Sequence, residues 1–279
     1  MKILICNDGS EQAERAMKIG AAIAAGCNAE VTLLGIIESP GRAAALLESL
    51  QRGQSLLEDK NIHAELITKS GKPIQEIVRR TEEAHYDLVV IGAVLKAARG
   101  LFWMSSKSYR IIKEIEPPVL LVAGACVSIK RVLICSGGRH YIDNAVRLAG
   151  EIARGVGAQV VLLHVMPEAP AIYAPLRRMH ETAATLLESP SELGRNLRSS
   201  REMLEAPGVP TELHLRRGSV LAEILEEIRT GGYDLVVTGS ALHHSLRTYV
   251  LGDISREIVN RAGCSVLVVR PAEGRVTDK

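Results

Sequence analysis

The chain has 279 residues, of which 47% are hydrophobic and 24% are charged, the profile of a soluble globular protein of about one to two domains. Its formal net charge of +2 is too small to favour nucleic acid or an acidic membrane surface as a partner, and 3% of aromatic residues are too few to stack the bases of a single strand. There is no apolar run long enough to cross a membrane, and the N-terminus, MKILICNDGS, lacks a signal-peptide pattern. We therefore expect a cytoplasmic protein without nucleic-acid or membrane partners.

The five cysteines are an odd number and form no C-x-x-C pair; they stand at Cys6, Cys27, Cys126, Cys135 and Cys264. Such spacing indicates reduced, buried thiols rather than disulfides or a zinc site. We accordingly expect no metal site.

Strand and helix patterns alternate along the first half of the chain. Strands are predicted at residues 2–7, 30–37, 62–68, 87–92 and 118–123, and helices near residues 11–25, 42–59, 73–84 and 105–115. Gly26 is expected to end the first helix, as C-terminal glycines do. The strands are nearly continuous runs of Val, Ile and Leu, which is typical of parallel strands buried on both faces. The alternation predicts an open α/β sheet with helices on both sides.

The second half of the chain repeats the first. KILICNDGS (2–10) returns as RVLICSGGR (131–139) and AEVTLLGI (29–36) as AQVVLLHV (158–165), both 129 residues later. YDLVVIGA (86–93) returns as YDLVVTGS (233–240) and PVLLVAG (118–124) as SVLVVRP (265–271), both 147 residues later. The second copy therefore carries 18 extra residues within 166–209, which form either a lid over a ligand or a longer pair of surface helices. We predict two domains, residues 1–126 and 127–279.

The turns after the strands are the places where such a sheet binds ligands, above all where the strand order reverses. NDGS (7–10) follows the first strand, and GSALHHSLRTYVLGDIS (239–255) follows the fourth strand of the second copy. Gly239 and Gly252 fit the first and third glycines of the pattern Gly, two residues, Gly, nine residues, Gly and then Ser or Thr. With these turns, the closing SVLVV strand and the duplication, the chain resembles the universal stress protein family over nearly its whole length.

The resemblance implies a fold and an assembly. It implies two tandem Rossmann-like or flavodoxin-like domains, each a five-stranded parallel sheet of order 3-2-1-4-5 with helices on both faces. It also implies an intramolecular pseudo-dimer through antiparallel contact of the last strands, residues 118–123 and 265–270, and leaves a homo-oligomer open. Phe102 and Trp103, the only Phe and Trp of the chain, are expected to pack between domains or subunits rather than to stack on a base.

The second copy departs from the family's nucleotide pattern. Leu242 replaces the middle glycine, and Gly137 stands where the first strand should supply an Asp. Asp253 replaces the final hydroxyl residue, and we expect it to cap the last helix and to fill the anion position with its own carboxylate. Arg139 and Arg247 could partly compensate. A self-capped helix without ligand is favoured here.

The first copy keeps other parts of the pattern. Asp8 is present, followed by Gly9 and Ser10; it either accepts a hydrogen bond from a ribose hydroxyl or caps the helix at 11–25. After the fourth strand, Gly92 keeps the first glycine and Leu95 replaces the second. The third glycine and its hydroxyl neighbour become Ser105, Ser106 and then Lys107, which together with a helix N-terminus make a reasonable anion site.

The family's adenine contact is made by backbone at the end of the second strand, which maps to Ile36 in the first copy and Val165 in the second. The leading hypothesis is a cytoplasmic universal stress response protein that acts through binding rather than turnover, with ATP or another adenine nucleotide in domain 1 and a degenerate site in domain 2. The alternative is a ligand-independent interaction or dimerisation scaffold in which both sites are lost. Slow ATP hydrolysis stays open, although the sequence offers no evident general base or pair of metal sites.

Overall fold

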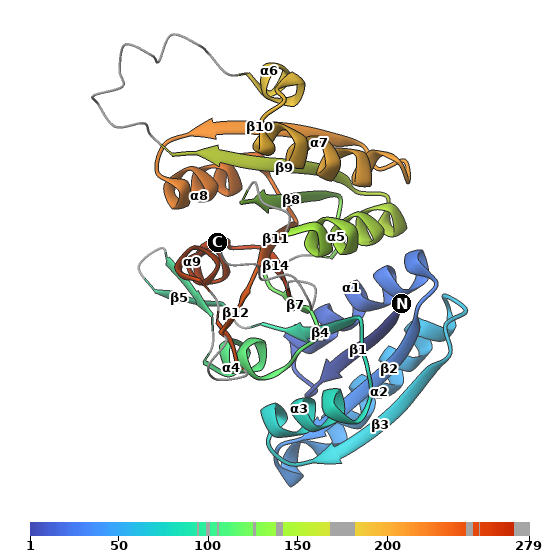
Figure 1. Ribbon diagram of the computed structural model, residues 1–279. Coiled ribbons are helices and arrows are strands. Elements are labelled where there is room, and N and C mark those ends of the chain that lie inside the picture. Colours follow the sequence, from blue (N-terminus) through green and yellow to red (C-terminus); the bar gives the residue numbers. More distant parts are fainter. Residues whose placement is uncertain are drawn as a thin grey trace.

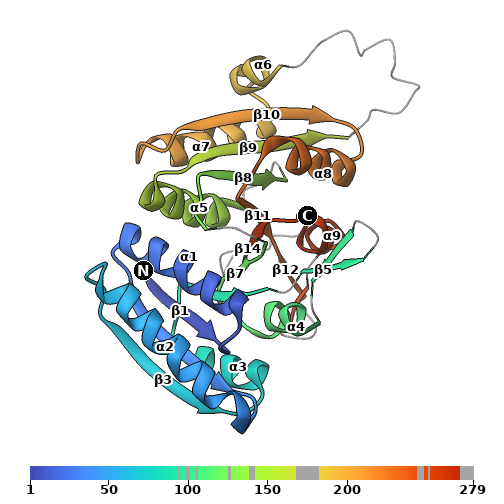
Figure 2. The ribbon, with the colours of Figure 1, turned by 180° about the vertical axis from the view of Figure 1, so that it is seen from behind.

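The computed structural model describes residues 1–93, 95–98, 101–104, 106–124, 127–137, 142–167, 182–243, 248–250 and 252–270, with backbone only for 95–98, 101–104, 106–107, 241–243 and 248–250. These residues form a ten-stranded sheet with helices on both faces and two short hairpins beside it (Figures 1 and 2). The α/β fold predicted from the alternating patterns is confirmed.

The first copy follows the predicted order of elements closely. Its strands are β1 (Lys2–Asn7), β2 (Glu30–Ile37), β3 (Ala64–Ser70), β4 (Leu88–Gly92), β5 (Leu95–Ala98), β6 (Leu101–Met104) and β7 (Val119–Val122). Its helices are α1 (Glu11–Cys27), the 3₁₀ turn η1 (Pro40–Arg42), α2 (Ala43–Glu58), α3 (Pro73–Glu83) and α4 (Ser106–Glu114). The hairpin of β5 and β6 was not predicted.

The second copy has the same plan with an insertion after its second strand. Its strands are β8 (Arg131–Ser136), β9 (Gln159–Met166), β10 (Thr211–Arg217), β11 (Leu235–Gly239), β12 (Ala241–His243), β13 (Thr248–Val250) and β14 (Ser265–Val269). Its helices are α5 (Asp143–Val156), α6 (Ala183–Glu188), α7 (Glu192–Glu205), α8 (Val220–Gly231) and α9 (Asp253–Arg261). Within 166–209, α6 and α7 form the expected helix pair, while residues 168–181 lie outside the described residues, so the lid alternative stays a hypothesis.

The sheet has the strand order β10-β9-β8-β11-β14-β7-β4-β1-β2-β3. Each half therefore reads 3-2-1-4-5, and all pairs within a half are parallel. The halves join through β14 and β7, which pair antiparallel with Val266 opposite Leu121 and Val268 opposite Val119. The expected contact between the last strands is thus present, and it makes one continuous sheet from two copies.

The core lies on both faces of this sheet, which is why the inner strands read as continuous apolar runs, whereas the edge strands β3 and β10 are only partly buried. In β1, Ile3 and Ile5 face one layer of helices while Leu4 and Cys6 face the other. Helices α1, α2, α5, α6 and α7 cover the first face, and α3, α4, α8 and α9 cover the second. The carboxyl ends of the strands in each half are left for a site.

Helices α1 and α5 meet where the two copies join, and this contact corrects the prediction for Gly26. Helix α1 continues to Cys27 and is capped by Asn28 in the left-handed conformation (φ 49°), so Gly26 does not end it. A Cβ on Gly26 would lie 2.0 Å from the carbonyl oxygen of Gly155 on α5. The glycine is required for the close approach of two helix backbones rather than for a cap.

The two hairpins cross between the copies. Strand β6 of the first copy packs against α9 of the second, and β13 of the second packs against α4 of the first. Figures 1 and 2 show β5 beside α9 and β12 beside α4. The backbone position of β6 places Phe102 and Trp103 in an interdomain segment, although their ring contacts lie outside the described side chains.

Candidate functional site

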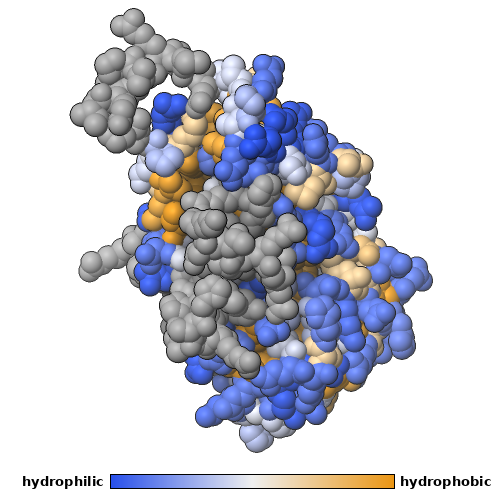
Figure 3. Space-filling model, viewed as in Figure 1, coloured by the Kyte–Doolittle hydropathy of each residue, from blue (hydrophilic) through white to orange (hydrophobic). Residues whose placement is uncertain are grey.

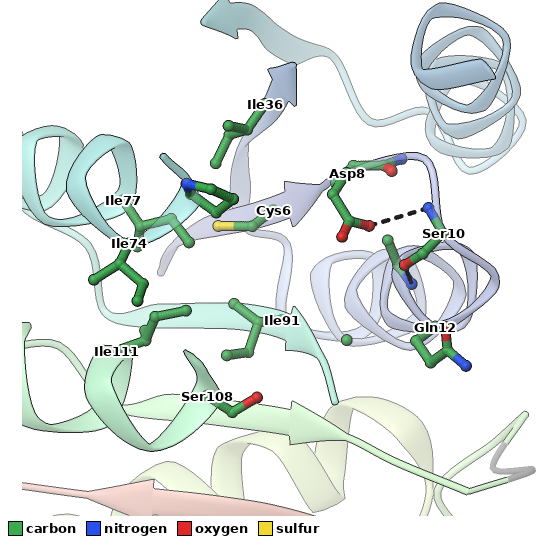
Figure 4. Close-up of a pocket in the computed structure, with 14 residues that line it drawn as sticks. Cys6, Asp8, Ser10, Gln12, Ile36, Ile74, Ile77, Ile91, Ser108 and Ile111 are labelled. Atoms are coloured by element: carbon green, nitrogen blue, oxygen red, sulfur yellow. Dashed lines mark hydrogen bonds between the residues drawn. The ribbon is translucent and has the colours of Figure 1, made fainter. Parts of the chain in front are cut away.

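A pocket opens at the carboxyl ends of β1, β2 and β4, where the strand order of the first copy reverses (Figure 4). It encloses about 130 Å³ and is walled by α1, α3 and α4. The residues that line it are Cys6, Asn7, Asp8, Ser10, Gln12, Ala13, Ile36, Pro73, Ile74, Ile77, Ile91, Gly92, Ser108 and Ile111. Of the predicted residues, Asp8, Ser10, Ile36 and Gly92 therefore lie together.

The polar wall of the pocket is the turn between β1 and α1. Oδ1 of Asp8 accepts a hydrogen bond from the Ser10 amide at 3.0 Å, and Oγ of Ser10 accepts one from the Ala13 amide at 3.2 Å. Ser10 is thus the N-cap of α1, so the capping alternative for Asp8 is wrong. Asp8 braces the turn instead, and its carboxylate lines the pocket (Figure 4).

The turn is held from beneath by Asn7, which is 1% exposed. Its Nδ2 donates to Oγ of Ser49 on α2 at 2.9 Å, and its Oδ1 accepts from the Gly9 amide at 2.8 Å. Gly9 has φ +75°, and a Cβ there would lie 3.1 Å from the backbone of Leu46. Gly9 therefore shapes the turn without lining the pocket.

The opposite wall is apolar. Five isoleucines from β2, α3, β4 and α4 line it: Ile36, Ile74, Ile77, Ile91 and Ile111. At its floor, burial raises the pKa of the Cys6 thiol strongly, and the charge of Asp8 raises it further. The thiol is therefore neutral and behaves as a small hydrophobic group rather than as a nucleophile.

Gly92 lies where β4 meets the first turn of α1. A Cβ at this position would lie 2.5 Å from the carbonyl carbon of Gln12 and 2.7 Å from the amide nitrogen of Ala13. The glycine thus lets strand and helix touch at the rim of the pocket. Its place in the glycine pattern reflects backbone packing in this structure.

The predicted anion position lies at the start of α4. Ser106 is the first residue of this helix and Lys107 the second, but their side chains are not described, and Ser105 lies outside the described residues. Ser108, one residue further along the helix, is 4% exposed and lines the pocket. Ser108 was not predicted from the sequence, although its repeat at Ser255, 147 residues later, could have drawn attention to it.

The corresponding position in the second copy is built differently. Thr238 replaces the pocket's Ile91, and its Oγ1 lies 2.9 Å from Oγ of Ser255, which donates to the Gly239 carbonyl at 2.7 Å. Val165 is the penultimate residue of β9 and has 6% of its surface exposed, and Gly137 supplies no carboxylate. Among the described residues of the second copy, the position of Asp8 thus holds no carboxylate, and Val165 and Thr238 replace two of the isoleucines.

The expectation that Asp253 caps the last helix is wrong. The N-cap of α9 is Gly252, without a side-chain hydrogen bond, and Asp253 is the first helical residue. Its side chain is 95% exposed and lies 3.6 Å from Arg256 in the next turn of the helix, so it stands one residue too far along the chain to be the cap. The side chain of Leu242 is not described, and Arg139 and Arg247 lie outside the described residues.

Other chemistry is limited within the described residues. They contain no group of three or more metal-binding side chains, and Cys6, Cys27, Cys135 and Cys264 are free thiols, while Cys126 lies outside them. None of the helices described has the length and hydropathy that a membrane span requires. The pocket in the first copy is thus the candidate site.

Comparison with known proteins places this fold and pocket in context. The model of the universal stress protein family matches residues 1–123 and again residues 128–270. A universal stress protein of Methanocaldococcus jannaschii is 26% identical over 141 residues, which span 50% of this chain and 82% of that protein. One of Bacillus subtilis is 25% identical over 148 residues, which span 50% of this chain and 98% of that protein.

Two solved structures resemble the whole chain. A universal stress protein of Archaeoglobus fulgidus has a TM-score of 0.70 at 20% identity, with 97% of this chain and 98% of that chain covered. A functionally unknown protein of Pseudomonas aeruginosa has a TM-score of 0.69 at 15% identity, with 97% and 92% covered. At these identities the likeness establishes the tandem fold.

Proposed function

Because the chain belongs to the universal stress protein family, with two copies of the family's domain, we propose that it is a cytoplasmic stress response protein that binds an adenine nucleotide in its first domain. ATP is the leading candidate. The observation that carries the proposal is the pocket of domain 1, which sets the carboxylate of Asp8 opposite a wall of isoleucines. An apolar slot with a few polar groups at one end suits a flat base joined to a hydroxyl-bearing sugar.

The proposed pose follows from these walls. The adenine ring lies between Ile36 and Ile77, and the backbone at Ile36 bonds its polar edge. A ribose hydroxyl donates to Asp8, whose Oδ1 already accepts one hydrogen bond from the Ser10 amide. The phosphates point toward the start of α4, at Ser105, Ser106 and Lys107, where amide groups and the helix dipole favour an anion.

The size of the pocket limits what it encloses. About 130 Å³ is smaller than the ~300–1,000 Å³ of a typical ligand pocket, so only the base is enclosed and the phosphates stay near solvent. In domain 2, the candidate positions Val165, Gly239 and Gly252 lack a partner equivalent to Asp8. We propose one nucleotide per chain.

We propose binding without turnover. The bound state of the protein would then itself be the signal. ATP incubated with the protein should release phosphate no faster than in a blank without protein. A sustained rate above the blank, lost in an Asp8→Asn variant, would instead assign slow hydrolysis to this pocket.

The second candidate function is a ligand-independent scaffold. It is favoured by the extensive joining of the two copies through β7, β14 and the crossed hairpins, which needs no nucleotide. Such a scaffold could also form a homo-oligomer, which a measurement of the molecular mass in solution would detect.

Thermal unfolding separates the two functions. ATP at 100 times its Kd should stabilise a one-site protein by about 2.7 kcal/mol, which raises Tm by several degrees. Asp8→Ala and Ser106→Asp should abolish the rise. Asp253→Ala is the matched control, because this exposed carboxylate begins the equivalent helix of domain 2. If ATP does not raise the Tm of the unmodified protein, the ligand-independent scaffold remains as the proposed function.

A further inference from the structure

Helix α4 belongs to the pocket at one end and to the domain junction at the other. Ser108 and Ile111 line the pocket of domain 1. One turn further on, the carbonyl groups of Ile112 and Ile115 face the second domain. The position of this pocket wall therefore depends on what holds the far end of α4.

A buried arginine of domain 2 holds that end. Arg270 follows β14 and is 5% exposed. Its Nη2 donates to the carbonyl oxygen of Ile112 and, at 2.9 Å, to that of Ile115. A guanidinium can be buried at such a place because helix C-terminal carbonyls carry negative partial charge and lack partners within the helix.

Arg270 is itself fixed by domain 2. Its Nη1 donates to Oγ of Ser240 at 2.9 Å, and its backbone carbonyl accepts from Nδ2 of Asn144 on α5 at 3.0 Å. Ser240 directly follows Gly239, at the point where β11 leads into the hairpin of β12 and β13. That hairpin packs on α4 through β13, so two separate contacts join domain 2 to the same helix.

The arrangement is one-sided. The residue of domain 1 that corresponds to Arg270 in the repeat, 147 positions earlier, is Ala123. Alanine has no side-chain donor, so domain 1 cannot hold α9 in the way that domain 2 holds α4. Domain 2, whose own candidate site is the weaker, therefore holds a helix that lines the candidate site of domain 1.

We propose that Arg270 is a positioning residue for the pocket of domain 1, and that domain 2 sets the ligand affinity of domain 1 through it. The effect on affinity rests on the nucleotide binding proposed above, whereas the effect on α4 does not. Loss of charge-assisted hydrogen bonds of this kind changes an equilibrium by about tenfold or more. The second domain is then a regulator of the first rather than an idle copy.

Hydrogen exchange of the ligand-free full-length protein tests the grip. In Arg270→Met, amides of α4 should exchange about tenfold faster than in the unmodified protein, while those of α3, which receives neither of these two hydrogen bonds, should keep their rates. Arg256→Met, an exposed arginine on α9, is the matched control and should change neither helix. Equal α4 rates in Arg270→Met and the unmodified protein would overturn the inference.

ATP titration of the same variants tests the consequence. Arg270→Met should weaken binding about tenfold, and Arg270→Lys, which keeps the charge without the fork of donors, should recover part of it. Faster exchange of α4 with unchanged ATP affinity would make Arg270 merely structural and would overturn the positioning role. If the unmodified protein binds no ATP, the proposed function fails, and the exchange rates alone then decide whether Arg270 holds α4.

Discussion

Glu227 on α8 offers a sharp test of the energetics of domain 2. Its side chain is 6% exposed, yet three donors meet its carboxylate. Oη of Tyr233 lies at 2.6 Å, Nδ1 of His214 at 2.8 Å and Nε of Arg216 at 2.5 Å. Burial alone would raise the pKa of Glu227, but these hydrogen bonds and the charge of Arg216 outweigh it and lower the pKa from 4.5 to about 2.

The size and sign of the effect follow from this pKa. A carboxyl whose pKa is lower in the folded state stabilises the fold above its ordinary pKa and loses that contribution as the pH falls through the folded value. A shift from 4.5 to about 2 corresponds to about 3 kcal/mol above pH 6 and about 1 kcal/mol at pH 3. The window of lost stability therefore lies between about pH 4.5 and about pH 2.

Urea unfolding of the unmodified protein and Glu227→Gln at a series of pH values measures this contribution. The difference between their free energies of unfolding should fall by roughly 2 kcal/mol from pH 6 to pH 3. Glu226→Gln is the matched control, because that neighbouring carboxylate is 45% exposed and the hydrogen bonds described for it come from Arg229. A Glu227→Gln difference that stays constant with pH would refute the reasoning.

Three further outcomes follow from the packing and the thiols. Gly26→Ala should lower the free energy of unfolding by about 1–3 kcal/mol, because its Cβ would collide with Gly155, whereas Gly41→Ala, with open space around it, should change it little; urea unfolding checks both. Burial raises the pKa of Cys27 to about 11, so mass spectrometry should find it alkylated by iodoacetamide far more slowly in the folded than in the urea-unfolded protein, and equal rates would contradict this. Ile77→Ser should weaken ATP binding in a calorimetric titration, since it places a hydroxyl in the apolar wall, and an unchanged Kd would remove the isoleucine wall from the site.

The strands and the duplication could be predicted from sequence because both are written locally. Each buried strand is a run of apolar residues, and β3 was displaced by only two residues, from 62–68 to Ala64–Ser70. The hairpins could not be predicted. Each is three or four residues per strand and packs on the other copy's helix, so its stability comes from contacts that no local pattern contains.

The site was predictable mainly on its polar side, and Ile36 was the one residue of the isoleucine wall that was predicted. Asp8 and Ser10 lie in a recognisable turn, but which of them caps α1 depends on hydrogen bonds that sequence does not specify. The apolar wall comes from four separate elements, so it exists only after folding. The hydrogen bonds of the repeated tyrosines also became visible only in the fold. Tyr86 accepts a hydrogen bond from Arg80, whereas its repeat Tyr233 donates one to Glu227, which stands at the position of Arg80 in the second copy.

We have proposed that one adenine nucleotide binds in the pocket beside Asp8. Isothermal titration of the full-length protein with ATP tests it most directly, because the stoichiometry and the site are read together. The account predicts one ATP per chain for the unmodified protein and no saturable binding for Asp8→Asn. Binding that survives unchanged in Asp8→Asn, or no binding to the unmodified protein, would contradict it.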